Sequence, residues 1–372
     1  MTFMRIVFYA VNGSGVGHLM RCIAVARNIR KLASERSLRV EIFFLTSSEA
    51  TSRLFSEGFP AFKLPSRETI ENTGFSADKF SAIATEWTRK TLELLSPDLL
   101  VVDTFPSGYY EELPDVFALA SNTAIISRPV KFSNIDTYDF LKALERYDAV
   151  IVPESRESSS FVFPAAMQKR IKHFGAIMSR NEDELIGREA VRQGLGIPAH
   201  KLIIYVSAGG GGDENAEKTI THVYKSLRDL PNIHFVIGVG PLYRGGRIYD
   251  PNVILFEDEN AFEMMKGFDI AISAAGYNTF HELMFTGTPT IFLPQEKWAD
   301  DQLLRAKRAA EVGAATFFES MPLEDALRQA VFYWNDRSKR QKMSLAAKLL
   351  VPKNHASEVA EYLIQLLKQT SI

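Results

Sequence analysis

Several kinds of feature are scarce in this sequence of 372 residues, and each scarcity excludes a class of protein. The single cysteine, Cys22, cannot build a disulfide framework, so a reducing compartment is permitted. No apolar run approaches the roughly 18 residues that a membrane-spanning helix needs. The formal net charge of −2 gives no overall attraction to nucleic acid, which is therefore not expected as a partner.

The N-terminal segment lacks the pattern of a secretory leader, because the run MRIVFYA leads directly into a glycine-rich turn. We therefore expect a cytoplasmic protein. What is present is ordinary for a globular chain, with 46% hydrophobic and 24% charged residues. The length predicts two or three domains.

Short apolar runs alternate with helix-period segments almost throughout the chain. The runs predicted to be strands are 5–10, 40–45, 98–102, 123–126, 149–152, 201–206, 234–239, 269–272 and 290–293. Several are apolar at every position, which is typical of parallel strands covered on both faces. Repeated strand–helix alternation predicts an α/β fold with right-handed crossovers and doubly wound sheets.

The pattern restarts in mid-chain, which indicates two doubly wound domains. A glycine-rich strand-to-helix turn occurs at 12–18 and again at 207–212, with a polar segment between them. The predicted parts are a first domain at 1–178, a linker with one short helix at 179–199, a second domain at 200–350, and a final amphipathic helix at 351–372.

The first glycine-rich turn, NGSGVGHLMR, includes Gly15 and Gly17, which let the backbone approach a ligand closely. A dinucleotide loop is the alternative, but the spacing is not G-x-G-x-x-G and no acidic residue ends the second strand. His18 follows the turn, and an imidazole with a pKa of roughly 6.5 suits removal of a proton from a hydroxyl. The alternative is that His18 only orients the loop.

The second turn, SAGGGGDEN, includes Ser207, Gly209 and Gly210. Consecutive glycines expose backbone N–H groups, and the following helix offers its positive end, which together form a phosphate-binding arrangement. The absence of Gly-Lys-Ser/Thr excludes a P-loop. The alternative is a turn without a ligand.

Asp103 ends a predicted strand and is expected near His18, where it would orient the imidazole or bind a substrate. An aspartate at a strand end is also a common turn former. The histidines show no metal-ligand spacing, and no D-x-D motif is present, so neither a metal nor a cofactor is expected.

The most specific pattern lies at 273–306, where two strand–turn–helix units follow each other. Its spaced positions are Gly276, Thr279, Glu282, Gly287, Pro289, Asp301 and Gln302. In order and spacing these residues resemble the nucleotide-sugar site of the family 28 glycosyltransferases, which reads G-x-x-T-x-x-E, then G-x-P, then an acid-or-amide–Gln pair.

The resemblance implies a GT-B fold, with two Rossmann-like domains facing a central cleft and the last helix crossing back to the first domain. Glu282 would bind both ribose hydroxyls, and Thr279, Ser207 and the loop amides would reach the diphosphate. The pair at 301–302 would contact the donor sugar.

Two further residues belong to this expected site. Arg180 corresponds loosely to a diphosphate-contacting arginine of similar enzymes, and a solvated linker arginine is the alternative. Asn278 is expected near the ligand, where it would cap the helix that carries Thr279.

Taken together, the resemblance implies an inverting, metal-independent glycosyltransferase that moves a hexose or N-acetylhexosamine from a UDP-sugar to a hydroxyl acceptor. His18 or Asp103 would help deprotonate that hydroxyl. The sequence does not identify the acceptor; a lipid acceptor would bring the protein to the inner face of the membrane. Two alternatives stay open: a UDP-sugar hydrolase like that of pseudaminic acid biosynthesis, which shares the G-x-G-H-x-x-R opening with His18 and Arg21, and a non-catalytic binder of nucleotide sugars.

Overall fold

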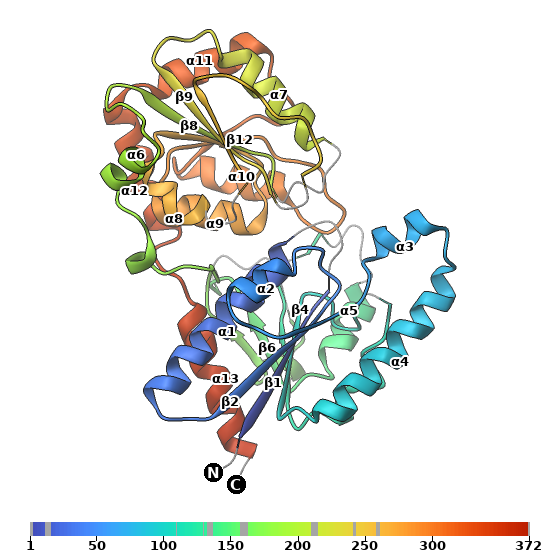
Figure 1. The fold of residues 1–372 in the computed structure, drawn as a ribbon. Coiled ribbons are helices and arrows are strands. Elements are labelled where there is room, and N and C mark those ends of the chain that lie inside the picture. Colours follow the sequence, from blue (N-terminus) through green and yellow to red (C-terminus); the bar gives the residue numbers. More distant parts are fainter. Residues whose placement is uncertain are drawn as a thin grey trace. The chain divides into compact units, whose positions relative to one another are not determined.

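The computed structural model describes residues 3–11, 16–108, 110–128, 130–131, 137–156, 163–209, 215–240, 243–257 and 261–370. Two of the predicted ligand-binding glycines, Gly15 and Gly210, lie outside these residues. The chain divides into two compact units (Figure 1). Unit 1 comprises residues 1–179 and 355–372, and unit 2 comprises residues 180–354.

Unit 1 is built on a seven-stranded sheet in the order β3-β2-β1-β4-β5-β6-β7, and all of its neighbouring strands pair in parallel. The strands are β1 (Met4–Ala10), β2 (Val40–Thr46), β3 (Ala61–Lys63), β4 (Leu99–Asp103), β5 (Thr123–Ile126), β6 (Ala149–Val152) and β7 (Ile171–His173). The helices are α1 (Gly17–Glu35), α2 (Ser52–Ser56), α3 (Arg67–Thr73), α4 (Ala77–Leu95), α5 (Thr137–Leu144) and α13 (Ala356–Thr370), with short 3₁₀ helices η1 (Phe117–Leu119) and η3 (Ala165–Met167).

Unit 2 has a six-stranded parallel sheet in the order β10-β9-β8-β11-β12-β13. The strands are β8 (Leu202–Ser207), β9 (Ile233–Gly238), β10 (Val253–Phe256), β11 (Ile270–Ser273), β12 (Thr290–Phe292) and β13 (Thr316–Phe317). The helices are η4 (Glu182–Glu184), α6 (Arg188–Gly194), α7 (Ala216–Leu227), α8 (Ala261–Met264), η5 (Met265–Gly267), α9 (Tyr277–Thr286), α10 (Gln302–Glu311), α11 (Glu324–Trp334) and α12 (Arg337–Leu350).

Both faces of each sheet are buried, as the apolar runs predict. In β1, Ile6 and Phe8 point to the face covered by α1 and α13, whereas Val7 and Tyr9 join the core with residues of α4 and α5. Figure 1 shows α13, in red, running alongside α1, in blue. In unit 2, α7 and α11 bury their apolar faces against β8 and β9.

The predicted doubly wound α/β fold is confirmed, and the elements that the sequence did not reveal have a common position. They are β3, β7, β10 and β13, which form the outer edges of the two sheets. The segment 179–199, expected to be a linker, is packed from Arg180 onward as part of unit 2, where it forms η4 and α6. The buried Arg192 side chain anchors α6 to Asp269, which precedes β11.

The chain passes between the units twice, at 179–180 and at 354–355. Within unit 2, the Asn354 side-chain amide donates hydrogen bonds of 3.0 Å to the Arg180 carbonyl and to Asn181 Oδ1. Within unit 1, the His355 N–H donates to the Ala176 carbonyl at 2.9 Å. The two connecting segments are therefore hydrogen-bonded to each other inside each unit.

In each sheet the strand order reverses once, which creates a topological switch point. The reversal lies between β1 and β4 in unit 1, and between β8 and β11 in unit 2. Open parallel sheets bind ligands outside the carboxyl ends of the strands at such points. Among the described residues, no helix has both the length and the apolarity required to cross a bilayer.

Candidate functional site

The switch point of unit 1 brings together the two predicted catalytic residues. His18 lies in the first turn of α1, and Asp103 is the last residue of β4. The His18 Nδ1 atom lies 2.6 Å from Asp103 Oδ2, and both side chains are buried. This hydrogen bond joins residues 85 positions apart in the sequence.

A third residue, Arg21, completes this buried cluster. It lies three residues after His18, so both side chains project from the same face of α1. The Arg21 guanidinium donates from Nε to Asp103 Oδ1 at 2.8 Å and from Nη2 to Oδ2 at 2.6 Å, which makes a bidentate ion pair. The sequence drew attention to Arg21 only through the hydrolase-like motif.

These contacts set the protonation states of the cluster. Burial by itself would raise the pKa of Asp103, but the Arg21 guanidinium and the hydrogen bond from His18 hold it well below its usual range. Burial lowers the pKa of His18 from its ordinary 6.5 and outweighs the opposing effect of Asp103, while Arg21 and Arg128 act in the same direction as burial. Because Arg21 already balances the carboxylate charge, His18 stays neutral near pH 7.

A neutral His18 has a defined tautomer. The ionised Asp103 is an acceptor only, so Nδ1 must carry the proton that it donates. The lone pair then lies on Nε2, which has no hydrogen-bond partner within the described part of the chain. His18 is therefore ready to accept a proton at Nε2, with Asp103 fixing the ring orientation.

Thr104, directly after Asp103, has a φ of 65°, a value that β-branched residues rarely adopt. The Phe105 N–H donates to the Asp103 carbonyl at 2.8 Å across Thr104, as in a γ-turn with positive φ. The Thr104 hydroxyl donates to Asp103 Oδ2 at 2.9 Å. Such backbone strain is concentrated at functional sites, and nothing in the sequence around Thr104 revealed it.

The switch point of unit 2 is formed by small residues and backbone groups. Ser207 and Ser273 pair directly across β8 and β11 and end both strands. The Ser207 Oγ accepts a hydrogen bond of 3.2 Å from the Gly209 N–H, which shapes the start of the glycine-rich loop. In unit 1, Gly17 of the first glycine-rich turn is the first residue of α1.

Helix α9 begins at this switch point without a side-chain cap. Its N-cap residue is Gly276, which has no side chain that could accept a hydrogen bond from the first turn. The expectation that Asn278 caps this helix is wrong, because Asn278 is already the second helical residue. The first turn contains no acidic residue, so the positive end of the helix dipole is unopposed there by its own carboxylates.

Thr279 and Glu282 lie one helical turn apart on α9, and both are partly exposed. In β8, Tyr205 stacks on Phe268 with 4.8 Å between ring centroids. Burial raises the pKa of Tyr205 to about 12, and the Glu282 carboxylate adds to that rise. The charge of Glu282 thus acts on Tyr205 of β8, two residues before Ser207.

Gln302 connects the loops at this edge of the sheet. Its Oε1 accepts hydrogen bonds from the backbone N–H groups of Ala275, at 3.1 Å, and Gln295, at 3.0 Å. The Gln295 side chain in turn donates to the Ala208 carbonyl at 3.3 Å. The loops after β8, β11 and β12 are therefore held together, and the predicted contact of Gln302 with a sugar stays a prediction.

Asp301 caps helix α10, because its Oδ1 accepts a hydrogen bond of 3.0 Å from the Leu304 N–H. On the same helix, Arg305 donates to the Ala275 carbonyl at 2.6 Å and forms an ion pair with Asp300 at 2.7 Å. The sequence did not single out Arg305 or Gln295. Only their proximity to the 301–302 pair could have indicated them.

Arg180 is not the solvated linker arginine considered as an alternative. Its side chain is only 13% exposed and its Nε lies 2.6 Å from Glu263 Oε1, next to η5 in unit 2. This ion pair fixes Arg180 close to the point where the chain enters unit 2. Its proposed contact with a diphosphate is a separate prediction.

Comparison with known proteins gives a consistent result. The Glycosyltransferase family 28 C-terminal domain matches residues 242–361. A UDP-N-acetylglucosamine–N-acetylmuramyl-(pentapeptide) pyrophosphoryl-undecaprenol N-acetylglucosamine transferase from Pasteurella multocida is 28% identical over 172 residues. That match covers 45% of this chain and about half (49%) of the relative's length.

Solved structures match over nearly the whole chain. The glycotransferase of kitacinnamycin has a TM-score of 0.67 at 17% identity and covers 99% of this chain and 100% of its own. MurG from Acinetobacter baumannii has a TM-score of 0.62 at 17% identity, with 98% and 99% covered. At this level of identity the likeness shows the fold, which is GT-B.

Proposed function

We infer that this chain, confirmed as similar to the family 28 glycosyltransferases, is a glycosyltransferase that uses a UDP-sugar. The observation that carries this proposal is the position of the family motif in unit 2. Gly276, Thr279 and Glu282 lie on the uncapped start of α9, at the switch point where the sheet edge is lined by Ser207 and backbone groups. A nucleoside diphosphate requires N–H donors and a ribose acceptor there.

In the proposed donor complex, the first-turn N–H groups of α9, Thr279, Ser207 and the loop that begins at Gly209 bind the diphosphate. Glu282 accepts hydrogen bonds from both ribose hydroxyls, which selects a ribonucleotide. Asp301 and Gln302 contact the sugar. The P. multocida relative is named as an N-acetylglucosamine transferase, so UDP-N-acetylglucosamine is the first donor to test.

Unit 1 supplies the base in this proposal. The acceptor hydroxyl gives its proton to His18 Nε2 as its oxygen attacks the anomeric carbon on the face opposite UDP. The bond between that carbon and the diphosphate oxygen breaks, and its electron pair leaves with UDP, so the configuration inverts. Asp103 stays ionised and stabilises the imidazolium that forms. General-base catalysis typically raises the rate of such a reaction by about 10²–10⁴-fold.

The charge that develops on the leaving diphosphate is stabilised by helix and loop N–H groups, so the reaction is proposed to need no metal ion. The acceptor is a hydroxyl compound. The name of the relative includes pyrophosphoryl-undecaprenol, which makes a lipid-linked acceptor one candidate. Such an acceptor would bring the protein to the inner face of the membrane as a peripheral protein.

The test is to incubate the protein with UDP-N-acetylglucosamine, with and without a panel of lipid-linked and soluble hydroxyl acceptors, and to measure UDP and free sugar. Acceptor-dependent UDP release that persists in EDTA is the expected result. Free sugar released without an acceptor would instead identify a hydrolase. Intact donor in every mixture, combined with measurable UDP binding, would identify a non-catalytic binder.

A further inference from the structure

A cavity of about 670 Å³ opens at the edge of the unit 2 sheet where the strands begin. Its wall includes Lys201, Asp269 and Pro289, which directly precede β8, β11 and β12. Because these strands are parallel, the cavity lies at the opposite edge from Ser207 and Ser273, about 20 Å away along β8. The volume is within the range of small-molecule sites.

The lining of this cavity is strongly basic, and we call it the basic cavity. Its lysines and arginines are Arg188, Lys201, Lys266, Arg337, Arg340 and Lys348, against the single carboxylate of Asp269. The chain as a whole has 43 basic and 45 acidic residues, so this excess does not reflect a basic protein. The positive charge is concentrated locally.

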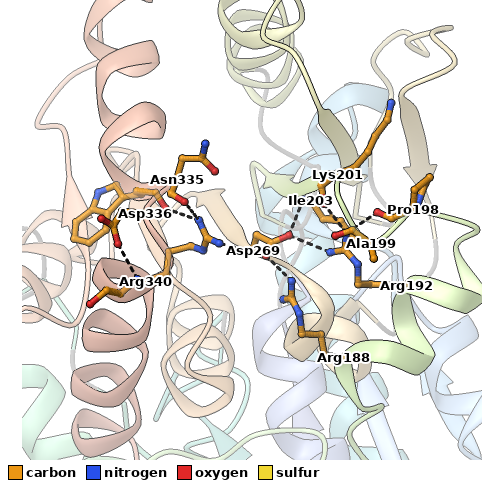
Figure 2. Close-up of polar contacts among 12 residues, drawn as sticks. Arg188, Arg192, Pro198, Ala199, Lys201, Ile203, Asp269, Asn335, Asp336 and Arg340 are labelled. Atoms are coloured by element: carbon orange, nitrogen blue, oxygen red, sulfur yellow. Dashed lines mark hydrogen bonds and ion pairs between the residues drawn. The ribbon is translucent and has the colours of Figure 1, made fainter.

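Asp269 cannot neutralise this charge, because its oxygens are already shared among several donors. Oδ1 lies 2.6 Å from Arg188 Nη2 and 3.9 Å from Arg340 Nη2, and Oδ2 accepts from Arg192 Nη1 at 3.1 Å and from the Ile203 N–H at 2.9 Å. Figure 2 shows the carboxylate lying between Arg340 of α12 and the two arginines of α6. Three guanidinium groups therefore face one carboxylate.

Of these three arginines, Arg340 also donates to the backbone carbonyls of Trp334 and Asn335, and Arg192 does not line the cavity. The contacts of Arg192 are structural. Its side chain is buried and donates to the carbonyls of Pro198, Ala199 and Lys201. Arg188 and Arg340 line the cavity. Burial lowers the pKa of Arg340, and the like charges of Arg188 and Arg337 act in the same direction, whereas the carboxylates of Asp269 and Asp336 oppose this shift. A bound anion would relieve this crowding.

Three other cations of the cavity have no carboxylate partner among the described residues. Within the described residues Arg337 and Lys348 form no ion pair, and Lys201 donates only to the neutral Asn252 side chain at 2.6 Å. The Lys348 stem lies over Gly287, since a Cβ there would be 2.7 Å from Lys348 Cε. Lys266 is paired with Glu182, at 2.5 Å.

The spacing of the cations indicates the size of the ligand. Arg337 and Lys348 are separated by three turns of α12, a rise of about 16 Å. A ligand with two or more phosphate groups can contact more of these cations at the same time than a single phosphate ion can. Guanidinium groups bind phosphate oxygens in bidentate geometry, and lysines add point charges.

We propose that the basic cavity binds a small polyanion that carries two or more phosphate groups, at a site separate from the proposed nucleotide site. This inference goes beyond the glycosyltransferase assignment and does not depend on it. The chemistry fits a soluble diphosphate or polyphosphate compound, and also a phosphorylated lipid headgroup. The experiment must therefore distinguish these two sources.

The probe is inorganic pyrophosphate, titrated into the full-length protein by calorimetry. The test variant is Arg337→Gln/Lys348→Gln, which removes two exposed cations outside the proposed catalytic and nucleotide sites. The matched control is Lys225→Gln/Lys342→Gln, which makes the same charge change at exposed lysines of α7 and α12 that do not line the cavity. Melting temperature without ligand checks that all three proteins fold.

We expect wild type and control to bind pyrophosphate equally, and the test variant to bind it about ten- to a hundredfold more weakly, as for one or two lost charge-assisted hydrogen bonds. Flotation with neutral and anionic phospholipid vesicles forms the second arm. Cavity-dependent binding to anionic vesicles alone would assign the phosphate groups to a lipid. Equal pyrophosphate affinity in all three proteins, or no binding to either probe, would overturn the proposal.

Discussion

The two switch points of this protein occupy equivalent places in similar sheets but use different chemistry. In unit 1 the edge between β1 and β4 carries a buried, charged cluster of His18, Arg21 and Asp103. In unit 2 the edge between β8 and β11 carries serines, glycines and the N-terminal end of α9. Side chains suited to moving a proton lie at one edge, and backbone groups suited to a phosphate lie at the other.

The proposed function assigns a different task to each of these switch points. A base needs a pKa adjusted by specific neighbours, which requires buried charges held at short distances. A diphosphate needs several N–H donors with no competing carboxylate, which small residues and a helix end provide. The predictions that follow test whether the two switch points are as separate in function as they are in chemistry.

The largest effect is expected from His18→Gln, which keeps an amide in place of the imidazole but removes the base. Turnover should fall by roughly 10²–10⁴-fold. UDP should still raise the melting temperature by the same amount as in wild type, because the residues proposed to bind the nucleotide lie in unit 2. Loss of UDP binding in this variant would show that the two switch points are not separate.

Asp103→Asn should reduce stability as well as activity. It leaves Arg21 as a buried charge without its partner, which typically costs about 3–5 kcal/mol in unfolding free energy. Chemical denaturation measures this change. The double variant Arg21→Met/Asp103→Leu is the control, since it should recover most of the stability and none of the turnover.

The pH profile tests the same cluster. Because burial lowers the pKa of His18 below its ordinary 6.5, the acid limb of kcat/KM should lie below pH 6.5. As the pH falls, His18 therefore takes up its proton at a higher pH in the unfolded protein than in the folded protein. The free energy of unfolding then decreases as the pH drops from 6.5 toward the pKa of His18 in the folded protein. In Asp103→Asn the acid limb of kcat/KM should move to lower pH, because the carboxylate that raises the pKa of His18 is gone. A shift to higher pH would contradict the inference that His18 is neutral near pH 7.

Glu282→Ala tests the nucleotide switch point with a smaller expected effect. Wild type should prefer UDP over 2′-deoxy-UDP, since a carboxylate that accepts from a hydroxyl contributes about 1.5–3 kcal/mol. In the variant both nucleotides should bind with the same, weakened affinity by calorimetry. A variant that still prefers UDP would show that the ribose is recognised by another residue.

The smallest effect is expected at Asp301, which caps α10 in the structure. Asp301→Asn keeps a good cap and should leave stability unchanged, whereas Asp301→Ala should lose about 0.5–2 kcal/mol. If the carboxylate also binds the sugar, Asp301→Asn should weaken UDP-N-acetylglucosamine binding relative to UDP. Equal affinities would restrict Asp301 to its structural role.

The inner strands of both sheets could be predicted because most of their residues are apolar, as expected of strands buried on both faces. The edge strands β3, β7 and β13 have only two or three residues, and β3 and β7 include exposed lysines, so they give no clear pattern. The edge strand β10 is the apolar run Val253–Phe256, which is as long as the inner strand β11, so its sequence could have indicated a strand. All four strands that the sequence analysis missed therefore lie at the outer edges of the two sheets.

The residues of the candidate site likewise fall into those that the sequence could predict and those that it could not. The residues of the 276–302 motif are local in sequence, so their spacing could be recognised. The pairing of Arg21 with Asp103 spans 82 residues and depends on β1 lying beside β4. The positive φ of Thr104 and the bracing by Gln302 likewise arise from tertiary contacts, and the basic cavity draws its residues from widely separated segments.

The hydrogen bonds of Asn354 to Arg180 and Asn181 have a consequence for the evolution of such proteins. Unit 2 is one uninterrupted segment whose first and last residues touch, and it enters unit 1 as an insertion between Ser179 and His355. A module with adjacent ends can be exchanged between genes by a single recombination at each end without stretching the host chain. Under the proposed function, such an exchange would change the donor-binding unit and leave the proposed base, His18, in place.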